Sequence, residues 1–231
     1  MKVVILAGGK GSRLSEITKS IPKPMVRIGK KPIIEHIINY YMKFGFKDFI
    51  IASGYKHLII KNYFKKKKIS ANIEVINTGA ETLTGSRIKK LTSRLTETFM
   101  LTYGDGLSNV NLKELLRFHK KENKMITLTA VHPPARFGEL TIAKDIVTNF
   151  EEKPQLQKGW INGGFFVVEP EFLKLIGKKN VMLERSPMIK AVKTKNLAAY
   201  KHKDFWFCMD TLRDKKVLDT MIKNKKSPWI K

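Results

Sequence analysis

A glycine-rich turn and two cations lie close together near the start of the chain, in the segment VILAGGKGSRLSEITKSIPKPM. Gly8, Gly9 and Gly11 let backbone N–H groups face an anion at close range. Arg13 offers a planar fork that can hold two phosphate oxygens, and Lys23 offers a point charge on a flexible stem. These residue types at this spacing indicate phosphate binding and therefore nucleotide chemistry.

The same segment does not fit two common phosphate-binding motifs. A P-loop needs Gly-Lys-Ser/Thr at a fixed spacing, which the segment lacks, and a dinucleotide fingerprint needs a small residue where Arg13 and Leu14 stand. A glycine pair after a strand is also typical of a plain tight turn between a strand and a helix. The residues alone leave phosphate binding and the plain turn open.

Two aspartates, Asp105 and Asp210, each follow a strand-like segment and are candidate metal ligands. Mg²⁺ prefers hard oxygen ligands and usually takes one or two carboxylates plus substrate phosphates, so two aspartates would suffice. Gly104 and Gly106 would let the backbone beside Asp105 approach a nucleotide closely. The alternatives are an Asp-Gly turn at Asp105 and, at Asp210, a cap for a helix beginning near Thr211.

Strand-like and helical segments alternate along the chain, which predicts an α/β fold with a Rossmann-like mixed, mostly parallel sheet and helices on both faces. After residue 126 the strands become short, and Lys144-Asp145 suits a hairpin turn, so we expect a small β-rich subregion facing a ligand or forming a lid. The expected strands span residues 2–7, 48–53, 72–77, 98–103, 126–131, 139–142, 146–150, 198–200 and 205–207. The expected helices are one that Pro32 opens and Gly45 closes, and others over residues 59–64, 111–121 with Asn111 as cap, 170–176, 183–193 and 211–223.

The composition is that of one soluble domain. A chain of 231 residues with 42% hydrophobic content can bury one good core. The single cysteine, Cys208, excludes an internal disulfide and suits a reducing compartment. No run of about 18 apolar residues and no signal-peptide pattern is present. We therefore expect a cytoplasmic protein with no membrane partner.

The formal net charge of +25 raises a second class of function, binding to nucleic acid or another anionic surface. The charge is mostly lysine and is scattered, and its densest run, Lys65 to Lys68, suits the solvated C-terminal end of a helix. The sequence carries no nucleic-acid motif with interleaved aromatic residues, so we expect no nucleic-acid partner. A positive field would equally attract nucleoside triphosphates and sugar phosphates.

The phrase LAGG-x-G-S-RL followed by PKPM resembles the sugar-1-phosphate nucleotidyltransferases. Later segments resemble the glucose-1-phosphate cytidylyltransferase branch of that family, and the resemblance covers nearly the whole chain. It implies one nucleotidyltransferase domain over residues 1–231, in which residues 1–125 mainly bind nucleotide and residues 126–231 mainly bind sugar phosphate. The segments are TGAETLTGSRIKK (78–90), TYGDG (102–106), PPARFGEL (133–140), FEEKP (150–154), INGGFFVVEP (161–170) and MDTLRD (209–214).

The resemblance implies transfer of a cytidylyl group from CTP to glucose 1-phosphate or a related hexose 1-phosphate, giving CDP-glucose and pyrophosphate. A phosphate monoester is largely dianionic at neutral pH, its second pKa being about 6, so neither a protein nucleophile nor a general base is needed. Arg13 and Lys23 would neutralise the triphosphate, and the resemblance places the catalytic Mg²⁺ on Asp105 and Asp210. These four residues are the expected catalytic set.

The resemblance also assigns two groups of binding residues. Without it, the segment around Thr82 is an ordinary loop with a helix cap, and the segment at Glu152 is a charged strand end. The expected nucleotide-binding residues are Leu6, Ala7, Gly8, Gly9, Gly11, Ser12, Arg13, Lys23, Thr82, Thr84, Gly85, Arg87 and Gly104. The expected sugar-phosphate-binding residues are Gly138, Glu152, Lys153 and Asn162, with Lys153 near the phosphate.

The chain departs from the family pattern in three places. Only Lys65 to Ser70 separates a helix from the next strand where the cytidylyltransferases have a longer connection, Ile21 stands where a lysine is usual, and Leu183 where a tryptophan is usual. The first departure affects a region for subunit contacts or for closure over the nucleotide in an expected homo-oligomer, and the last affects the sugar side. Uridylyl or thymidylyl transfer by the same chemistry, and a non-catalytic nucleotide-sugar sensor, are the alternatives.

Overall fold

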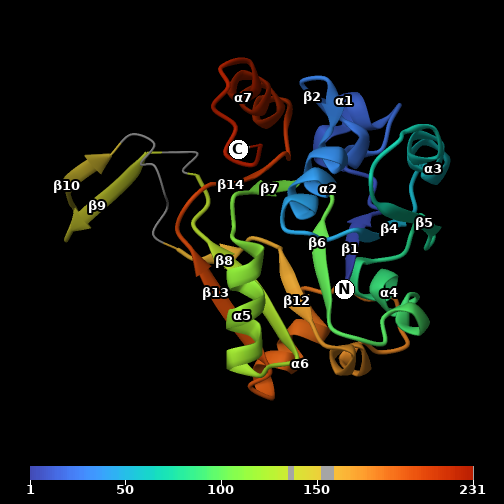
Figure 1. Ribbon diagram of the computed structural model, residues 1–231. Helices are drawn as coiled ribbons and strands as arrows, with labels where there is room; N and C mark the ends of the chain where they lie inside the picture. The colour runs from blue at the N-terminus through green and yellow to red at the C-terminus, as the bar shows by residue number, and fades with distance from the viewer. Residues whose placement is uncertain (135–137, 152–158, 231) are drawn as a thin grey trace.

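The computed structural model describes residues 1–134, 138–151 and 159–230, and it is built around one mixed sheet (Figure 1). The strands of this sheet are β1 (Lys2–Ala7), β4 (Asp48–Ser53), β5 (Asn72–Asn77), β6 (Phe99–Tyr103), β8 (Ile126–Val131), β11 (Ile161–Asn162), β12 (Phe166–Val168) and β13 (Leu197–His202). Their order is β11-β8-β12-β6-β1-β4-β5, and β13 also pairs with β8. β1 runs parallel to both β4 and β6, whereas β12 runs antiparallel to β6 and β8.

Helices and three small two-stranded sheets surround the main sheet. The small sheets pair β2 (Arg27–Ile28) with β3 (Lys31–Pro32), β7 (Gly106–Ser108) with β14 (Trp206–Cys208), and β9 (Glu139–Ala143) with β10 (Ile146–Glu151). The α-helices are α1 (Ser15–Thr18), α2 (Ile33–Lys43), α3 (His57–Lys66), α4 (Thr84–Lys89), α5 (Leu112–Glu122), α6 (Ser186–Lys193) and α7 (Leu212–Lys223). The 3-10 helices are η1 (Ser12–Leu14), η2 (Lys23–Met25), η3 (Thr92–Arg94) and η4 (Pro170–Leu175).

The side chains of β1 alternate between two apolar cores, one on each face of the sheet. Val3 and Ile5 pack in a core that also contains apolar residues of α2, α3, α5 and α7. Val4 and Leu6 pack in the other core, with residues of α4, η4 and α6. A strand that is buried on both faces needs an almost continuous apolar sequence, which is what residues 2–7 provide. The predicted mixed sheet with helices on both faces is confirmed.

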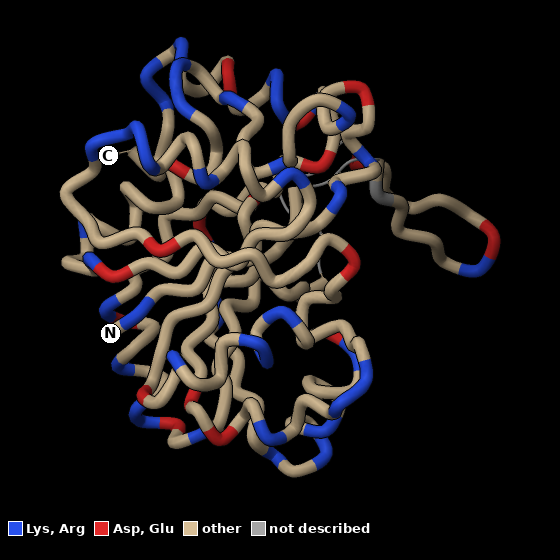
Figure 2. Tube along the Cα trace, turned by 90° about the vertical axis from the view of Figure 1, so that its right-hand side faces the viewer, with Lys and Arg blue, Asp and Glu red and all other residues tan. Residues whose placement is uncertain are grey.

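The hairpin of β9 and β10 extends away from the rest of the chain (Figures 1 and 2). Lys144 has a left-handed φ of 54° in its turn, as the Lys144-Asp145 pair predicted. The hairpin is the short-stranded subregion expected after residue 126, and its strands carry large exposed apolar side chains. These are Leu140, Ile142, Ile146, Val147 and Phe150, each at least half exposed.

Most predicted elements lie where the sequence placed them, and the differences have local causes. The segment predicted as a helix over 170–176 is the 3-10 helix η4. The helix predicted over 183–193 begins only at Ser186, because Leu183 is fully buried ahead of it and Pro187 suits the first helical turn. Asn111 caps α5 as predicted, since its side chain accepts hydrogen bonds from the Lys113 and Glu114 amides.

Lysine and arginine residues lie along many loops and helix ends around the molecule (Figure 2). Lys65 and Lys66 lie in the last turn of α3, where cations interact favourably with the helix dipole, as expected for this run. The described part of the chain contains no helix that is both long and apolar enough to span a bilayer.

Candidate active site

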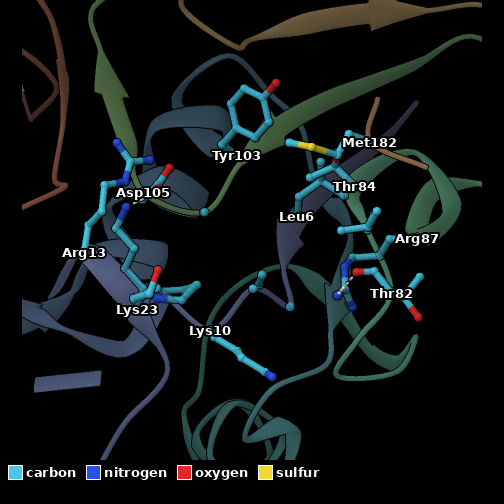
Figure 3. A pocket seen from close by; sticks show the side chains of 18 residues that line it. Leu6, Lys10, Arg13, Lys23, Thr82, Thr84, Arg87, Tyr103, Asp105 and Met182 are labelled. Atoms are coloured by element: carbon cyan, nitrogen blue, oxygen red, sulfur yellow. Dashed lines mark hydrogen bonds and ion pairs between the residues drawn. The ribbon is translucent and has the colours of Figure 1, made fainter. Parts of the chain in front are cut away.

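The C-terminal ends of β1 and β6 meet where the strand order reverses, because the chain runs from β1 outward through β4 to β5 and then returns to β6. In α/β sheets, ligands bind in the crevice at such a point. A cavity of about 510 Å³ opens there (Figure 3), within the usual size range of small-molecule sites. Every residue that the sequence assigned to nucleotide binding lines this cavity, except Gly85.

Two glycines at this edge pack closely against backbone. Gly104 follows β6, and a Cβ there would lie 2.9 Å from the Leu6 carbonyl oxygen, so any side chain would push β6 away from β1. Gly85 lies behind the cavity wall, where a Cβ would lie 3.0 Å from the Leu183 amide nitrogen and the Val181 carbonyl oxygen. The structure therefore places Gly104 in the cavity and Gly85 in the packing of α4 against residues 181–183.

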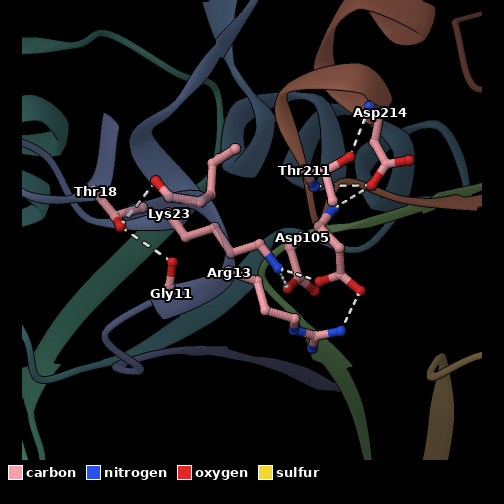
Figure 4. Close-up of polar contacts among 9 residues, drawn as sticks. Gly11, Arg13, Thr18, Lys23, Asp105, Thr211 and Asp214 are labelled. Atoms are coloured by element: carbon pink, nitrogen blue, oxygen red, sulfur yellow. Dashed lines mark hydrogen bonds and ion pairs between the residues drawn. The ribbon is translucent and has the colours of Figure 1, made fainter. Parts of the chain in front are cut away.

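The four expected catalytic side chains form one continuous chain of charges (Figure 4). The Lys23 ammonium donates to Asp105 Oδ2 at 2.6 Å and to Asp210 Oδ1 at 2.7 Å. The Arg13 guanidinium donates to the other oxygen of Asp210 at 2.6 Å. Lys23 is buried, whereas the Arg13 side chain is 73% exposed at the edge of the cavity. Residues almost two hundred positions apart in sequence thus form one cluster.

The short sheet of β7 and β14 brings the two aspartates together. Cys208 pairs with Gly106 in this sheet, and the Met209 amide donates to the Asp105 carbonyl oxygen at 3.0 Å. Asp210 follows directly, before the first turn of α7. The meeting of Asp105 and Asp210 therefore depends on the pairing of β14, close to the strand predicted over residues 205–207, with β7, which was not predicted.

The first turn of α7 holds the backbone of Asp210 in place. Thr211 is the N-cap and forms a capping box with Asp214, whose carboxylate also accepts from the Asp210 amide at 2.9 Å. The alternative that Asp210 is itself the helix cap is wrong, because Thr211 fills that position. The Asp210 carboxylate is thereby left to face Lys23 and Arg13.

Burial lowers the pKa of the Lys23 ammonium, but the charge of Asp105 and the hydrogen bonds that Lys23 donates to both aspartates outweigh burial, so the net pKa is raised above its usual value. Lys23 therefore stays protonated at neutral pH. The neighbouring Cys208 thiol behaves in the opposite sense, because burial and the charge of Asp105 raise its pKa. Cys208 is accordingly a neutral thiol rather than a nucleophilic thiolate.

The donor set at this point fits a hard divalent cation. One ligand atom each from Asp105, Cys208 and Asp210 lie within 4.8 Å of one another. The carboxylate oxygens suit Mg²⁺, whereas a thiol is a soft ligand and does not. Lys23 already supplies one positive charge between the two carboxylates.

Across the cavity from this cluster, α4 and the loop before it present Thr82, Thr84 and Arg87 (Figure 3). The Arg87 guanidinium is buried and donates to the carbonyl oxygens of Ser53 (2.8 Å) and Thr82 (2.6 Å) and to the Thr78 hydroxyl. Arg87 therefore fixes the cavity wall by holding three chain segments together.

The sugar side of the site is only partly described. Asn162 donates to the Tyr103 hydroxyl at 3.1 Å, and Tyr103, which lines the cavity, donates to Glu184 at 2.6 Å. Burial, together with the Glu184 charge, raises the Tyr103 pKa, so its hydroxyl stays neutral. Gly138 directly precedes β9, while Glu152 and Lys153 lie outside the described residues.

Several residues of the site were missed from the sequence. Glu184 also accepts from the Thr84 hydroxyl at 2.7 Å, so it links the base side to Tyr103. Lys10 forms an ion pair with Glu81 at 2.7 Å, joining the glycine turn to the loop before α4. Tyr103 could have been predicted as part of the site, because it lies within the TYGDG segment. Nothing in the neighbouring sequence indicates a role for Glu184 or for the Lys10–Glu81 ion pair.

A family model described as nucleotidyl transferase matches residues 2–211. The chain is 41% identical to the glucose-1-phosphate cytidylyltransferase of Salmonella typhimurium, over 99% of this chain and 98% of that protein. It is 37% identical to the probable glucose-1-phosphate cytidylyltransferase of Bacillus subtilis, over 99% of each.

Two solved structures have the same fold. HddC from Yersinia pseudotuberculosis complexed with GMP-PN superposes with a TM-score of 0.75 at 24% identity, covering 96% of this chain and 99% of that one. A putative glucose-1-phosphate thymidylyltransferase from Bacillus anthracis superposes with a TM-score of 0.76 at 18% identity, covering 97% and 96%. The shared architecture extends over nearly the full length of each chain.

Proposed function

The chain belongs to the nucleotidyl transferase family, and we propose that its substrates are CTP and glucose 1-phosphate or a related hexose 1-phosphate. It is a nucleotidyltransferase that acts on a sugar 1-phosphate. The choice of CTP and glucose is supported by the names of its full-length relatives. The observation that carries the catalytic proposal is the charge cluster of Arg13, Lys23, Asp105 and Asp210 at the edge of the cavity.

In this proposal the sugar phosphate attacks the α-phosphorus of CTP, and the bond to the departing pyrophosphate breaks. The exposed Arg13 turns its guanidinium from Asp210 toward the triphosphate and offsets the charge that builds on the leaving group. Lys23 remains charged because its pKa is raised, and its ammonium, which lines the cavity, would interact with the α-phosphate. Mg²⁺ held by Asp105 and Asp210 would neutralise phosphate charge and bring the two anionic substrates together.

We assign the cytosine to the wall formed by Leu6, Gly8, Thr82, Thr84 and Arg87. Backbone amides and carbonyls of this wall can pair with N3, O2 and N4 of the base. Arg87 and the threonine hydroxyls already bond protein oxygens, so their role is to hold the backbone of the wall in shape. Selectivity would then come from unpaired backbone groups, which reject a mismatched base strongly.

The hexose phosphate is assigned to Gly138, Glu152, Lys153 and Asn162, in the part of the chain after residue 126. Asn162 supports this assignment, because its amide reaches Tyr103 on the cavity wall. The division into residues 1–125 for nucleotide and 126–231 for sugar phosphate is part of the same proposal, with Asp210 as the residue of the second part that serves the metal.

We also propose that the protein is a homo-oligomer and that the β9–β10 hairpin contributes to the interface. By the strand register, one face of the hairpin carries Leu140, Ile142, Val147 and Phe150, at 52%, 58%, 50% and 62% exposure, and the other face carries Ile146 at 69% exposure. Contiguous apolar surface of this kind marks association sites. Light scattering of the Ile146→Ser/Phe150→Ser variant should give a smaller mass than the unmodified protein, and equal masses would overturn the hairpin assignment.

The experiment that tests the function is release of pyrophosphate with Mg²⁺ and glucose 1-phosphate, with CTP, UTP, dTTP, ATP and GTP in separate reactions. Release with CTP above the other four is the expected result. Faster release with another triphosphate would keep the chemistry and overturn the base assignment. If no pyrophosphate is released with any of the triphosphates, with glucose 1-phosphate or with other hexose 1-phosphates, the catalytic proposal is wrong and a nucleotide-sugar sensor is favoured.

A further inference from the structure

A second cavity, of about 700 Å³, shares no lining residue with the active-site cavity. Its walls come from β2, α2, α7 and the segment after α7. Ile222, which is partly exposed, and Ile230, which is 50% exposed, supply its apolar surface, with Ile28 and Trp229 behind them at 0% and 1% exposure. Asn39 of α2 lines the cavity as well. A cavity of this size accommodates a drug-sized molecule.

The inner wall of this cavity is fixed in advance. Trp229 is only 1% exposed, and its indole N–H donates to His36 Nδ1 at 3.2 Å. His36 Nε2 in turn lies 3.0 Å from the Ile28 carbonyl oxygen, so it donates there and the ring is neutral. Phe205 stacks on Trp229 with ring centroids 5.4 Å apart. These contacts satisfy the polar atoms of the wall and leave its surface apolar.

The rim of the cavity is positively charged. Lys30 and Lys223 line it, and neither makes an ion pair or hydrogen bond with its side chain to any described residue. The carboxylate of Asp219, which also lines it, is engaged by the Lys215 ammonium at 2.6 Å and by the Gly29 amide at 2.7 Å. The charge of Asp219 is therefore neutralised. The net charge of the rim is positive because Lys30 and Lys223 have no partner among the described residues.

The cavity walls are continuous with the segments that carry catalytic side chains. β2 begins two residues after η2, the 3-10 helix that starts at Lys23, and α7 begins two residues after Asp210. A molecule that contacts Lys30, two residues after Ile28 of β2, and Ile222 of α7 would therefore touch both segments at once. A change in their spacing would alter the position of Lys23 relative to Asp210, which are joined by a 2.7 Å hydrogen bond.

We propose that this cavity is an effector site for an amphipathic anion, a small molecule with an apolar body and one carboxylate, sulfonate or phosphate group. The apolar body would lie against Ile222 and Ile230, and the anionic group would lie between Lys30 and Lys223. The coupling to the active site rests on the proposed function, whereas binding itself does not.

The test uses 8-anilino-1-naphthalenesulfonate as the probe, titrated into the full chain by fluorescence and calorimetry. We expect one site per chain whose occupancy persists in saturating CTP and Mg²⁺. Asn39→Phe fills the cavity from a half-exposed helix position and should abolish binding of the probe. Asn39→Ala leaves the cavity open and should retain binding. Unchanged circular dichroism for both variants would show that the fold is intact.

A charge comparison separates this site from general binding of an anion to a basic protein. Lys30→Gln/Lys223→Gln should weaken the probe about tenfold, in line with two partly exposed ion pairs. The matched variant Lys120→Gln/Lys190→Gln removes two exposed lysines of α5 and α6 that do not line the cavity, and it should change affinity less than about twofold. The proposed binding site would be contradicted by equal effects of the two lysine variants on affinity for the probe. It would also be contradicted if CTP with Mg²⁺ displaced the probe, or if the probe still bound to Asn39→Phe.

The effector role has its own readout. Saturating probe should change kcat/KM for pyrophosphate release about fivefold or more in the unmodified protein and not in Asn39→Phe. Binding at the cavity without any change in kcat/KM would overturn the effector role. Pyrophosphate release without the probe tests the proposed function independently, so the two failures can be told apart.

Discussion

Replacing Gly8 by alanine tests how rigidly the base side of the active site is built. A Cβ at Gly8 would lie 2.0 Å from both Cζ and a terminal nitrogen of the Arg87 guanidinium, far inside van der Waals contact. At the neighbouring Gly9 an added Cβ would have no heavy atom within 4 Å. Gly8→Ala and Gly9→Ala therefore form a matched pair within one turn, in which only the first forces Arg87 to move.

The cost follows from what Arg87 would lose. Its side chain is 2% exposed, and it donates hydrogen bonds to Ser53, Thr78 and Thr82. Moving the guanidinium aside breaks one or two of these bonds, and a hydrogen bond to a charged group contributes about 1.5–3 kcal/mol. Gly8→Ala should therefore destabilise the protein by about 2–4 kcal/mol and lower Tm by about 5–15 °C for a chain of this size.

Thermal unfolding followed by circular dichroism measures the difference between the two variants. Gly9→Ala should unfold within about 3 °C of the unmodified protein. In an Arg87→Met background the guanidinium is gone, so Gly8→Ala should cost less than about 1 kcal/mol. If Gly8→Ala is as stable as Gly9→Ala, or costs as much with Met at position 87, the reasoning about Arg87 is wrong.

Four further predictions concern the catalytic cluster, the sugar side and the protonation of one histidine. Arg13→Ala should lower kcat about 100-fold or more without lowering Tm, since the side chain is 73% exposed; unchanged pyrophosphate release would make Arg13 a turn residue. Asp210→Asn should raise the Mg²⁺ concentration for half-maximal rate about tenfold or more, and an unaltered Mg²⁺ titration would refute the ligand assignment. Lys153→Ala should raise KM for the sugar phosphate more than KM for CTP, and the reverse pattern would show that the roles are exchanged. Burial lowers the pKa of His36 below its usual 6.5, so protonation of His36 favours the unfolded chain, and stability is lost as pH falls below 6.5 toward the pKa of the folded state. From about pH 7 to about pH 5, the Tm of the unmodified protein should therefore fall more steeply than the Tm of His36→Gln. Parallel curves of Tm against pH for the two proteins would contradict this.

The sequence predicted well those parts of the fold that local chemistry decides. Strands β1, β4, β5 and β8 have the predicted bounds. β1 and β4 are nearly continuous apolar runs, whereas β5 and β8 alternate β-branched apolar residues with polar ones, and both patterns are typical of strands. The cap at Asn111 also follows from local hydrogen bonding, whereas the cap of α7 is Thr211 and not Asp210, the residue that the sequence offered for it.

The parts that were missed depend on contacts between distant segments. A strand was predicted over residues 205–207, close to β14, but its three-residue partner β7 was not predicted, and the pairing of the two brings Asp105 and Asp210 together. Glu184 gave no local signal because its partners, Thr84 and Tyr103, are about a hundred and about eighty residues away. Motif resemblance named the charged residues, but only the tertiary structure shows which of them touch.

The charge cluster also explains why metal and nucleotide should bind together. Arg13 and Lys23 carry two positive charges and Asp105 and Asp210 carry two negative ones, so the cluster is neutral although the whole chain has a formal charge of +25. A neutral cluster attracts a triphosphate weakly, whereas a divalent cation on the two carboxylates would give the same side chains a net charge of +2. Lys23 and Arg13 would then be released from the carboxylates to face the phosphates. By reciprocity, CTP must raise the affinity of the site for Mg²⁺ by the same factor as Mg²⁺ raises its affinity for CTP.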